Sequence, residues 1–192
     1  MARNGSNAVG SDCGGAMSVY ISVHGQRPRL VLVGAGHVNQ AIAHSAALSG
    51  FGLVIGDVWQ GSLNPEMFPA GAKLLHAETF TGVIDKMAIQ PGDFVLIATN
   101  NQDREVLNRL ITQPVAWLGL LSSRRKAQVF LRQMRESGVA AEDIARLRMP
   151  VGYDIGAETP GEIAISVLAE ILKVKNQAPG GFMTTKGENI AG

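Results

Sequence analysis

The fold is decided by one stretch of sequence, LVLVGAGHVN, at residues 30–39. Its first four residues are a Leu and Val run typical of a parallel strand that is covered on both faces. Gly34 closes the run and permits a tight turn, and Gly36 lets the backbone approach a phosphate. Asn39 stands where the usual fingerprint has a third glycine. The stretch predicts a strand, a glycine turn and a helix start, with an anionic ligand at the turn.

A helix and a second strand follow the turn. Residues 37–49 are rich in alanine at helical spacing and predict a helix. Gly50 follows at the position where a glycine in the left-handed conformation would end that helix. Residues 53–55 predict a second strand that ends at Gly56 and Asp57, about 20 residues beyond the turn. A carboxylate at this position can accept a hydrogen bond from a ribose hydroxyl. We expect a nucleotide-type ligand here. The alternative is a turn kept for packing alone, with Asp57 solvated.

The predicted helix opens with His37 and Val38, which we place in the ligand site. The positive end of the helix dipole disfavours an imidazolium, so we expect a neutral His37 whose ring can hydrogen-bond to a ligand. An exposed His37 without a partner is the alternative reading of the same position.

Strands and helices continue to alternate after a loop at residues 59–70. This alternation indicates a parallel sheet with right-handed crossovers and helices on both faces. We predict an α/β, Rossmann-like three-layer fold with a mostly parallel sheet, plus an N-terminal entry strand at residues 18–23. Further strands are predicted at 73–76, 94–98 and 115–120, and helices at 83–88, 101–111, 123–137, 141–147 and 160–174.

The chain is long enough for one domain. Residues 1–15 are rich in glycine and small polar residues and predict a flexible arm, because they bury too little apolar surface to offset ordering entropy. The domain is expected at 16–175 and a flexible tail at 176–192. Its last helix has a marked start, with Thr159 as cap, Pro160 at the first position and Glu162 completing a capping box.

A second anion site is predicted at the helix that follows the strand at residues 115–120. Ser122 and Ser123 precede Arg124, Arg125 and Lys126, three cations in a first turn where the helix dipole disfavours positive charge. Hydroxyls, free N–H groups and guanidinium groups together suit phosphate or another oxyanion. This site and the glycine turn should open on the same edge of the sheet. The alternative is a solvated basic face that binds nothing.

Two further segments carry polar groups. Residues 152–160 contain two glycines and the carboxylate of Asp154, which either points into the ligand site or belongs to a shaped connector. Asn100 follows the strand at 94–98 and offers an amide for hydrogen bonding but no strong base. No hydrolase motif and no zinc-ligand spacing is present, so no catalytic residue is assigned.

The composition of the chain limits the classes of partner that it is expected to bind. The net charge of +1 gives no global field that would attract nucleic acid or a membrane. No apolar run reaches the roughly 18 residues of a spanning helix, and no signal sequence is apparent. Cys13, the single cysteine, excludes an internal disulfide and fits a reducing, cytoplasmic location. It is either an incidental thiol or a group that handles a metal or a redox step.

Four motifs together resemble the XdhC/CoxI family, the accessory proteins of molybdenum hydroxylases such as xanthine dehydrogenase. The resemblance to this family extends from about residue 12 to residue 174. Asn39 stands where that family has glycine, and family members carry a further domain where this chain has its short arm. The motifs are Cys13-Gly14-Gly15 with the strand at 18–23, Gly34-Ala35-Gly36-His37-Val38, LGLLSSRRK at 118–126 and PVGYDIGAETPGEIA at 150–164.

The resemblance implies a cofactor chaperone rather than an enzyme. Such a protein binds the molybdenum cofactor, as molybdopterin or a pterin dinucleotide, during sulfuration and insertion. The implied partners are an apo molybdenum hydroxylase and a cysteine desulfurase, and we expect a homodimer. An NAD(P)-dependent oxidoreductase and a nucleotide-sensing module remain alternatives. The predicted cofactor-binding residues are Gly34, Gly36, His37, Val38, Asn39, Asp57, Asn100, Ser122, Ser123, Arg124, Arg125 and Asp154, with Cys13 as a candidate metal ligand.

Overall fold

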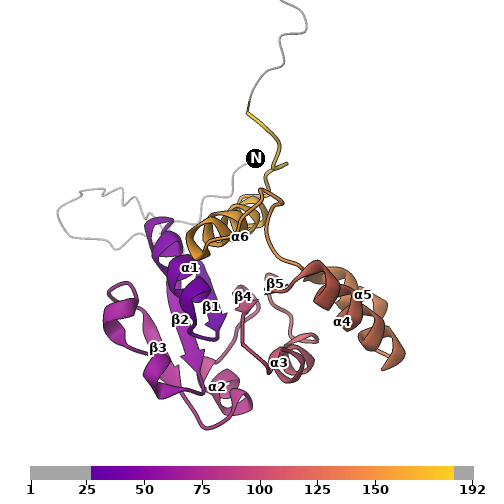
Figure 1. Cartoon of the computed structure of the whole chain (residues 1–192), viewed down its shortest axis with the longest axis horizontal. Coiled ribbons are helices and arrows are strands. Elements are labelled where there is room, and N and C mark those ends of the chain that lie inside the picture. The colour runs from indigo at the N-terminus through magenta and orange to yellow at the C-terminus, as the bar shows by residue number, and fades with distance from the viewer. Residues whose placement is uncertain (1–26, 184–192) are drawn as a thin grey trace, which may run out of the picture.

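The computed structural model describes residues 27–183, which fold around a single sheet (Figure 1). The six strands of this sheet all run parallel, in the order β3-β2-β1-β4-β5-β6. This is the order of doubly wound dinucleotide-binding folds, so the predicted Rossmann-like fold is confirmed. The strands are β1 (Arg29–Val33), β2 (Gly52–Asp57), β3 (Lys73–His76), β4 (Phe94–Ile97), β5 (Trp117–Leu120) and β6 (Leu147–Arg148).

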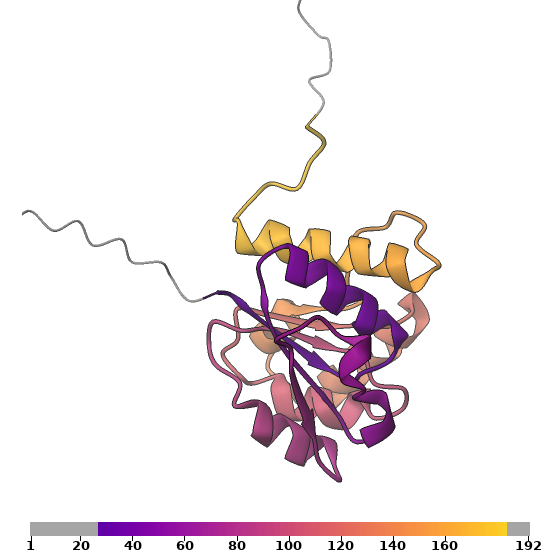
Figure 2. The same ribbon diagram turned by 90° about the vertical axis from the view of Figure 1, so that its left-hand side faces the viewer.

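Helices cover both faces of the sheet. The first and last helices lie side by side on one face, as Figure 2 shows, and the remaining helices pack on the other. No helix of residues 27–183 is long and apolar enough to cross a bilayer. The helices are α1 (His37–Leu48), α2 (Phe80–Met87), α3 (Asp103–Leu110), α4 (Arg124–Glu136), α5 (Ala141–Arg146) and α6 (Pro160–Lys175).

The central strand β1 explains why its sequence lacks polar alternation. Leu30 and Leu32 belong to the apolar cluster beneath α1 and α6, whereas Val31 and Val33 belong to the cluster beneath α2 and α3. All four side chains are 0% exposed. A parallel strand covered on both faces needs apolar residues at every position. Because β1 is an inner strand, the turn at Gly34 that follows it lies near the middle of the carboxyl edge of the sheet.

The structure shifts several of the predicted element boundaries by one to three residues. The helix predicted at 83–88 begins at Phe80, because the Thr79 side chain accepts a hydrogen bond from the Gly82 N–H and caps an earlier start. The helix predicted at 141–147 ends at Arg146, because Leu147 pairs with Leu118 and opens the short strand β6. The loop predicted at 59–70 contains two short 3₁₀ turns, η1 (Gln60–Ser62) and η2 (Pro65–Met67).

The predicted capping box of α6 is confirmed. Thr159 Oγ1 accepts from the Glu162 N–H at 3.3 Å, and the Glu162 carboxylate accepts in return from the Thr159 N–H at 2.9 Å. The entry strand predicted at 18–23, Cys13, the arm predicted at 1–15 and the end of the predicted tail lie outside the described residues.

Candidate functional site

A cavity lies at the point where the chain reverses the direction in which it adds strands to the sheet. Strands β1 and β4 are neighbours in the sheet, yet β2 and β3 separate them in sequence. Ligands of open α/β sheets bind at such switch points, beyond the carboxyl ends of the strands. A cavity of about 770 Å³ opens here, lined by residues that follow β1, β2 and β4. We call it the first cavity.

The glycine turn forms one wall of the first cavity. Gly34 has φ +105°, and a Cβ there would lie 2.3 Å from the Ala98 carbonyl oxygen, so only glycine fits. Gly36 is different, because a Cβ at this position would meet no atom within 4 Å. Gly36 is the N-cap of α1, no side chain caps this helix, and its first turn holds no acidic residue. The N–H groups in the first turn of α1 therefore have no side-chain cap, and the space beside Gly36 is open, as an anion site requires.

Asn39 supports the turn from below. Its side chain is 1% exposed and lines no cavity, and its Nδ2 group donates to the Gly34 carbonyl oxygen at 2.8 Å. The Oδ1 atom is buried and has no hydrogen-bond partner among the described residues. Asn39 thus holds the position of a fingerprint glycine by fixing the turn with its amide.

Asp57 ties the turn to the end of β2. One carboxylate oxygen accepts from the Ala35 N–H at 2.7 Å, and the other accepts from the Trp59 N–H at 2.9 Å. Asp57 lines the first cavity together with His37, which is exposed. On the side of β4 the wall is rich in carboxamides, supplied by Asn100, Asn101 and Gln102. These groups can both donate and accept hydrogen bonds.

A second cavity of about 320 Å³ lies beyond the ends of β5 and β6. Ser122, Arg124 and Asp154 line it, and the Ser122 hydroxyl is buried without a hydrogen-bond partner among the described residues. Arg124 and Asp154 form an ion pair in which the side chains are 78% and 77% exposed. The neighbouring Ser123 caps α4 through the Lys126 N–H at 3.2 Å. The loop around Asp154 is therefore joined to the basic helix.

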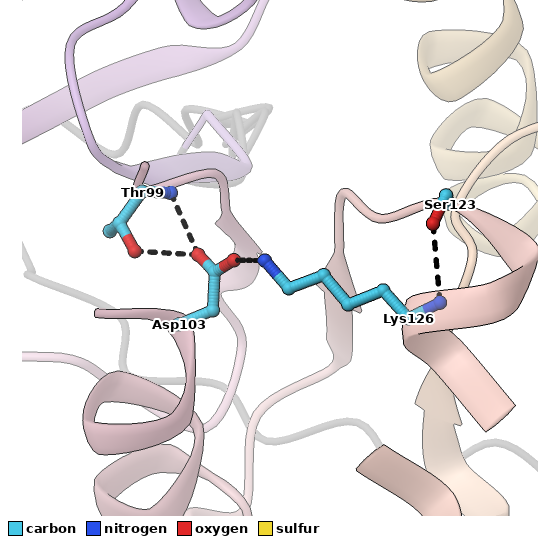
Figure 3. A network of polar contacts seen from close by, with 4 residues as sticks. All are labelled: Thr99, Asp103, Ser123 and Lys126. Carbon is cyan, nitrogen blue, oxygen red and sulfur yellow. Dashed lines mark hydrogen bonds and ion pairs between the residues drawn. The ribbon is translucent and has the colours of Figure 1, made fainter. Parts of the chain in front are cut away.

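The side chain of Lys126 reaches from the start of α4 to Asp103 at the start of α3 (Figure 3). Its ammonium group donates to Asp103, a carboxylate that is 2% exposed at the start of α3. Asp103 also accepts from the Thr99 N–H at 3.0 Å, and Thr99 lines the first cavity. Two of the three cations predicted to need an external anion thus have carboxylate partners within the protein.

The structure divides the predicted residues into three groups. The two cavities have no lining residue in common, and both follow the carboxyl ends of parallel strands. Trp59, which lines the first cavity, was missed, because the sequence places it in a loop without a motif. The first cavity takes Gly36, His37, Asp57 and Asn100, the second takes Ser122, Arg124 and Asp154, and neither takes Gly34, Val38, Asn39, Ser123 or Arg125.

The arrangement is suited to holding an anionic ligand. The first cavity combines free helix N–H groups, carboxamides and an aromatic side chain. Within residues 27–183, no three His, Cys, Asp or Glu side chains are grouped so that they could hold a metal ion.

Comparison with known proteins relates the chain to one family. A family model described as the XdhC Rossmann domain matches residues 30–171. The chain is 71% identical over 183 residues to the uncharacterized protein YqeB of Escherichia coli (strain K12), covering 95% of this chain and 34% of YqeB. It is 31% identical over 153 residues to the molybdenum cofactor insertion chaperone PaoD of the same strain, covering 79% of this chain and 42% of PaoD.

A solved structure shares the fold. The crystal structure of a xanthine dehydrogenase from Bacillus halodurans superposes with a TM-score of 0.69 at 27% identity, over 79% of this chain and 43% of that one. The chain thus spans between 34% and 43% of the length of these three proteins.

Proposed function

The chain belongs to the XdhC family through its Rossmann domain, and on that premise we propose that it is an accessory protein of a molybdenum hydroxylase. In this role it binds the molybdenum cofactor, as molybdopterin or a pterin dinucleotide. It shields the cofactor while the terminal sulfur is installed and then passes it to the apo-hydroxylase. The name of PaoD, a molybdenum cofactor insertion chaperone, supports this proposal.

One observation carries the proposal, namely the uncapped start of α1 above the open side of Gly36. A phosphate of the cofactor would accept from the N–H groups of this first turn, where the helix dipole also favours negative charge. The missing Cβ of Gly36 leaves room for that approach. Asn39 keeps the turn rigid from beneath through its bond to Gly34.

The shape and chemistry of the first cavity fit a ligand of this kind. Its volume of about 770 Å³ lies within the range of roughly 300–1,000 Å³ found for ligand pockets. The carboxamides of Asn100, Asn101 and Gln102 offer donors and acceptors for the edge of a pterin ring. When bound, the cofactor carries its own metal and redox chemistry, and the protein's residues orient it and exclude water.

The second cavity supplies a further anion-binding surface. The buried hydroxyl of Ser122 has no partner within the described residues, and Arg124 can leave its exposed pair with Asp154 at little cost. We assign this surface to a second anionic group of the cofactor, or of the protein that receives it. The proposed partners are an apo molybdenum hydroxylase and a cysteine desulfurase, and the proposed assembly is a homodimer.

The proposal is tested with two substitutions at one position. Gly36→Ala adds a methyl group to the open space through which the phosphate would approach, and it should weaken binding. Gly36→Asp keeps the fold, because aspartate is a favoured N-cap, but its carboxylate takes the N–H groups that a phosphate needs. Saturable binding of released molybdopterin, measured by calorimetry, should be weakened in Gly36→Ala and lost in Gly36→Asp. It should be unchanged in the control Leu48→Ala, because Leu48 is exposed on α1 and lines neither cavity.

Two results would contradict the proposal. One is wild-type protein that neither binds the cofactor nor improves activation of an apo-hydroxylase. The other is tight binding of NADH together with dehydrogenase activity, which would favour an oxidoreductase.

A further inference from the structure

Trp59 is an exposed aromatic side chain inside the first cavity. It is 69% exposed and lines the cavity with the glycine turn, while the other tryptophan, Trp117, is 3% exposed in the core. Large aromatic side chains carry much apolar area, so an indole that is exposed and lines a cavity offers a contact surface to a ligand in that cavity.

The backbone of Trp59 is fixed at both ends. Its N–H donates to Asp57 at 2.9 Å, and its carbonyl oxygen accepts from the Ser62 hydroxyl at 2.8 Å and from the Ser62 N–H at 3.1 Å. Asp57 also accepts from the Ala35 N–H, so one carboxylate joins the glycine turn to the tryptophan. The position of the indole is thereby set relative to the proposed phosphate site.

The indole itself rests on a glycine. A Cβ at Gly61 would lie 2.9 Å from both Cε2 and Cζ2 of Trp59, so a side chain at residue 61 would displace the ring. With Gly61 the ring lies against the backbone of η1, and much of its surface remains open. A seated, rigid indole is a platform for stacking, because it loses little conformational entropy when a planar ring covers it.

From these contacts we infer that Trp59 stacks on a planar nitrogen heterocycle of the ligand whose phosphate lies at the glycine turn. The inference rests on the proposed function and extends it to the part of the ligand that is recognised. Two heterocycles can meet this description, the pterin and the base of a dinucleotide arm. Stacking on an aromatic side chain tolerates different rings, since each presents a π face.

Fluorescence titration of the full chain tests the inference. The probes are 6-hydroxymethylpterin for the pterin, CDP and GDP for the nucleotide arm, and ribose 5-phosphate and pyrophosphate as compounds without such a ring. Ring-bearing probes should quench the emission of Trp59, and the ring-free compounds should not. Trp59→Phe should lose the quenching while keeping affinity within about threefold, because phenylalanine still stacks.

Two further variants separate stacking from general apolar contact. Trp59→Ala should weaken binding of the ring-bearing probes about tenfold and leave pyrophosphate binding unchanged. Gly61→Ala should act in the same direction by displacing the indole. Leu48→Ala is the matched control, because Leu48 is 92% exposed on α1 and lines neither cavity. It should bind every probe as the wild type does.

The outcomes distinguish this inference from the function on which it rests. Unchanged binding of ring-bearing probes by Trp59→Ala, or no ring-dependent quenching at millimolar probe, overturns the stacking role. If molybdopterin binds Trp59→Ala at wild-type affinity, the proposed chaperone function is supported and the stacking role of Trp59 is rejected. If the nucleotides stack on Trp59 but molybdopterin does not bind, the platform stands and the chaperone function falls. The pterin and nucleotide probes show which ring is taken.

Discussion

Lys126 of α4 donates a hydrogen bond to Asp103 of α3, although the two residues are 23 positions apart and strand β5 lies between their helices in the sequence. The carboxylate is 2% exposed and also accepts from Thr99 at the edge of the first cavity. The pair therefore joins the starts of α3 and α4.

Removing this charge pair should destabilise the fold. Asp103→Asn keeps an oxygen for the Thr99 N–H but leaves Lys126 without its anion, and we expect a loss of about 2 kcal/mol because the lysine can still reach water. Lys126→Met strands a buried carboxylate and should cost about 3 kcal/mol. Urea unfolding measures both variants. Equal stability of Lys126→Met and the wild type would show that the pair contributes nothing.

The stability of the protein should be more sensitive to alanine at Gly34 than to alanine at Gly36. Gly34→Ala places a Cβ against the Ala98 carbonyl at a positive φ, and we expect it to lower the free energy of unfolding by about 2–4 kcal/mol. Gly36→Ala should cost less than about 1 kcal/mol, the scale of an N-cap change. Thermal and urea unfolding of both variants provide the comparison, and a stable Gly34→Ala would exclude the described turn.

The two neighbouring arginines should separate binding from stability. Arg124→Ala removes an ion pair that is largely exposed to solvent and should change the free energy of unfolding by less than about 0.5 kcal/mol. It should nevertheless weaken binding of a phosphate-bearing ligand at the second cavity by about tenfold. Arg125→Ala is the control, since Arg125 lines neither cavity. Equal affinities of the two variants would remove the second cavity from the site.

The start of α6 should become less stable in acid. Backbone N–H groups of Thr159 and then Glu158, followed by the Thr159 hydroxyl, hold the pKa of Glu162 below its ordinary value of 4.5. A carboxyl with a lowered pKa stabilises the folded state above its ordinary pKa, and this contribution disappears as the pH falls through the folded value.

The stability difference between the wild type and Glu162→Gln should therefore be present at pH 6 and vanish well below pH 4.5. Glu158→Gln, whose side chain takes no part in the box, should show no such dependence. Denaturant unfolding across this pH range is the measurement, and a difference that persists unchanged into acid would count against the capping role.

Most of the fold was predictable because the buried parallel strands appear in the sequence as short, uninterrupted apolar runs. The run at Leu30–Val33 has no polar position, and glycines or caps mark the ends of α1, α4 and α6. The strand β6 was not predictable, since Leu147 and Arg148 are too few for any period and follow a helical pattern. Its existence depends on pairing with β5, a contact between distant segments.

The site was predictable only in part, for a similar reason. Motifs located the glycine turn and the basic helix and placed both on one edge of the sheet, but they did not show that the residues of these two segments line separate cavities. Nor does local sequence show that Asp103 would neutralise Lys126 from 23 residues away. Trp59 has no motif at all, and its importance comes from its exposure beside the turn.

Asp57 already supplies the glycine turn with one anion, because its carboxylate accepts a hydrogen bond from the Ala35 N–H. That N–H is therefore occupied, whereas the N–H groups in the first turn of α1 have no side-chain cap. An anionic ligand at the turn would thus meet the start of the helix and not the loop before it, at the place where the helix dipole favours negative charge.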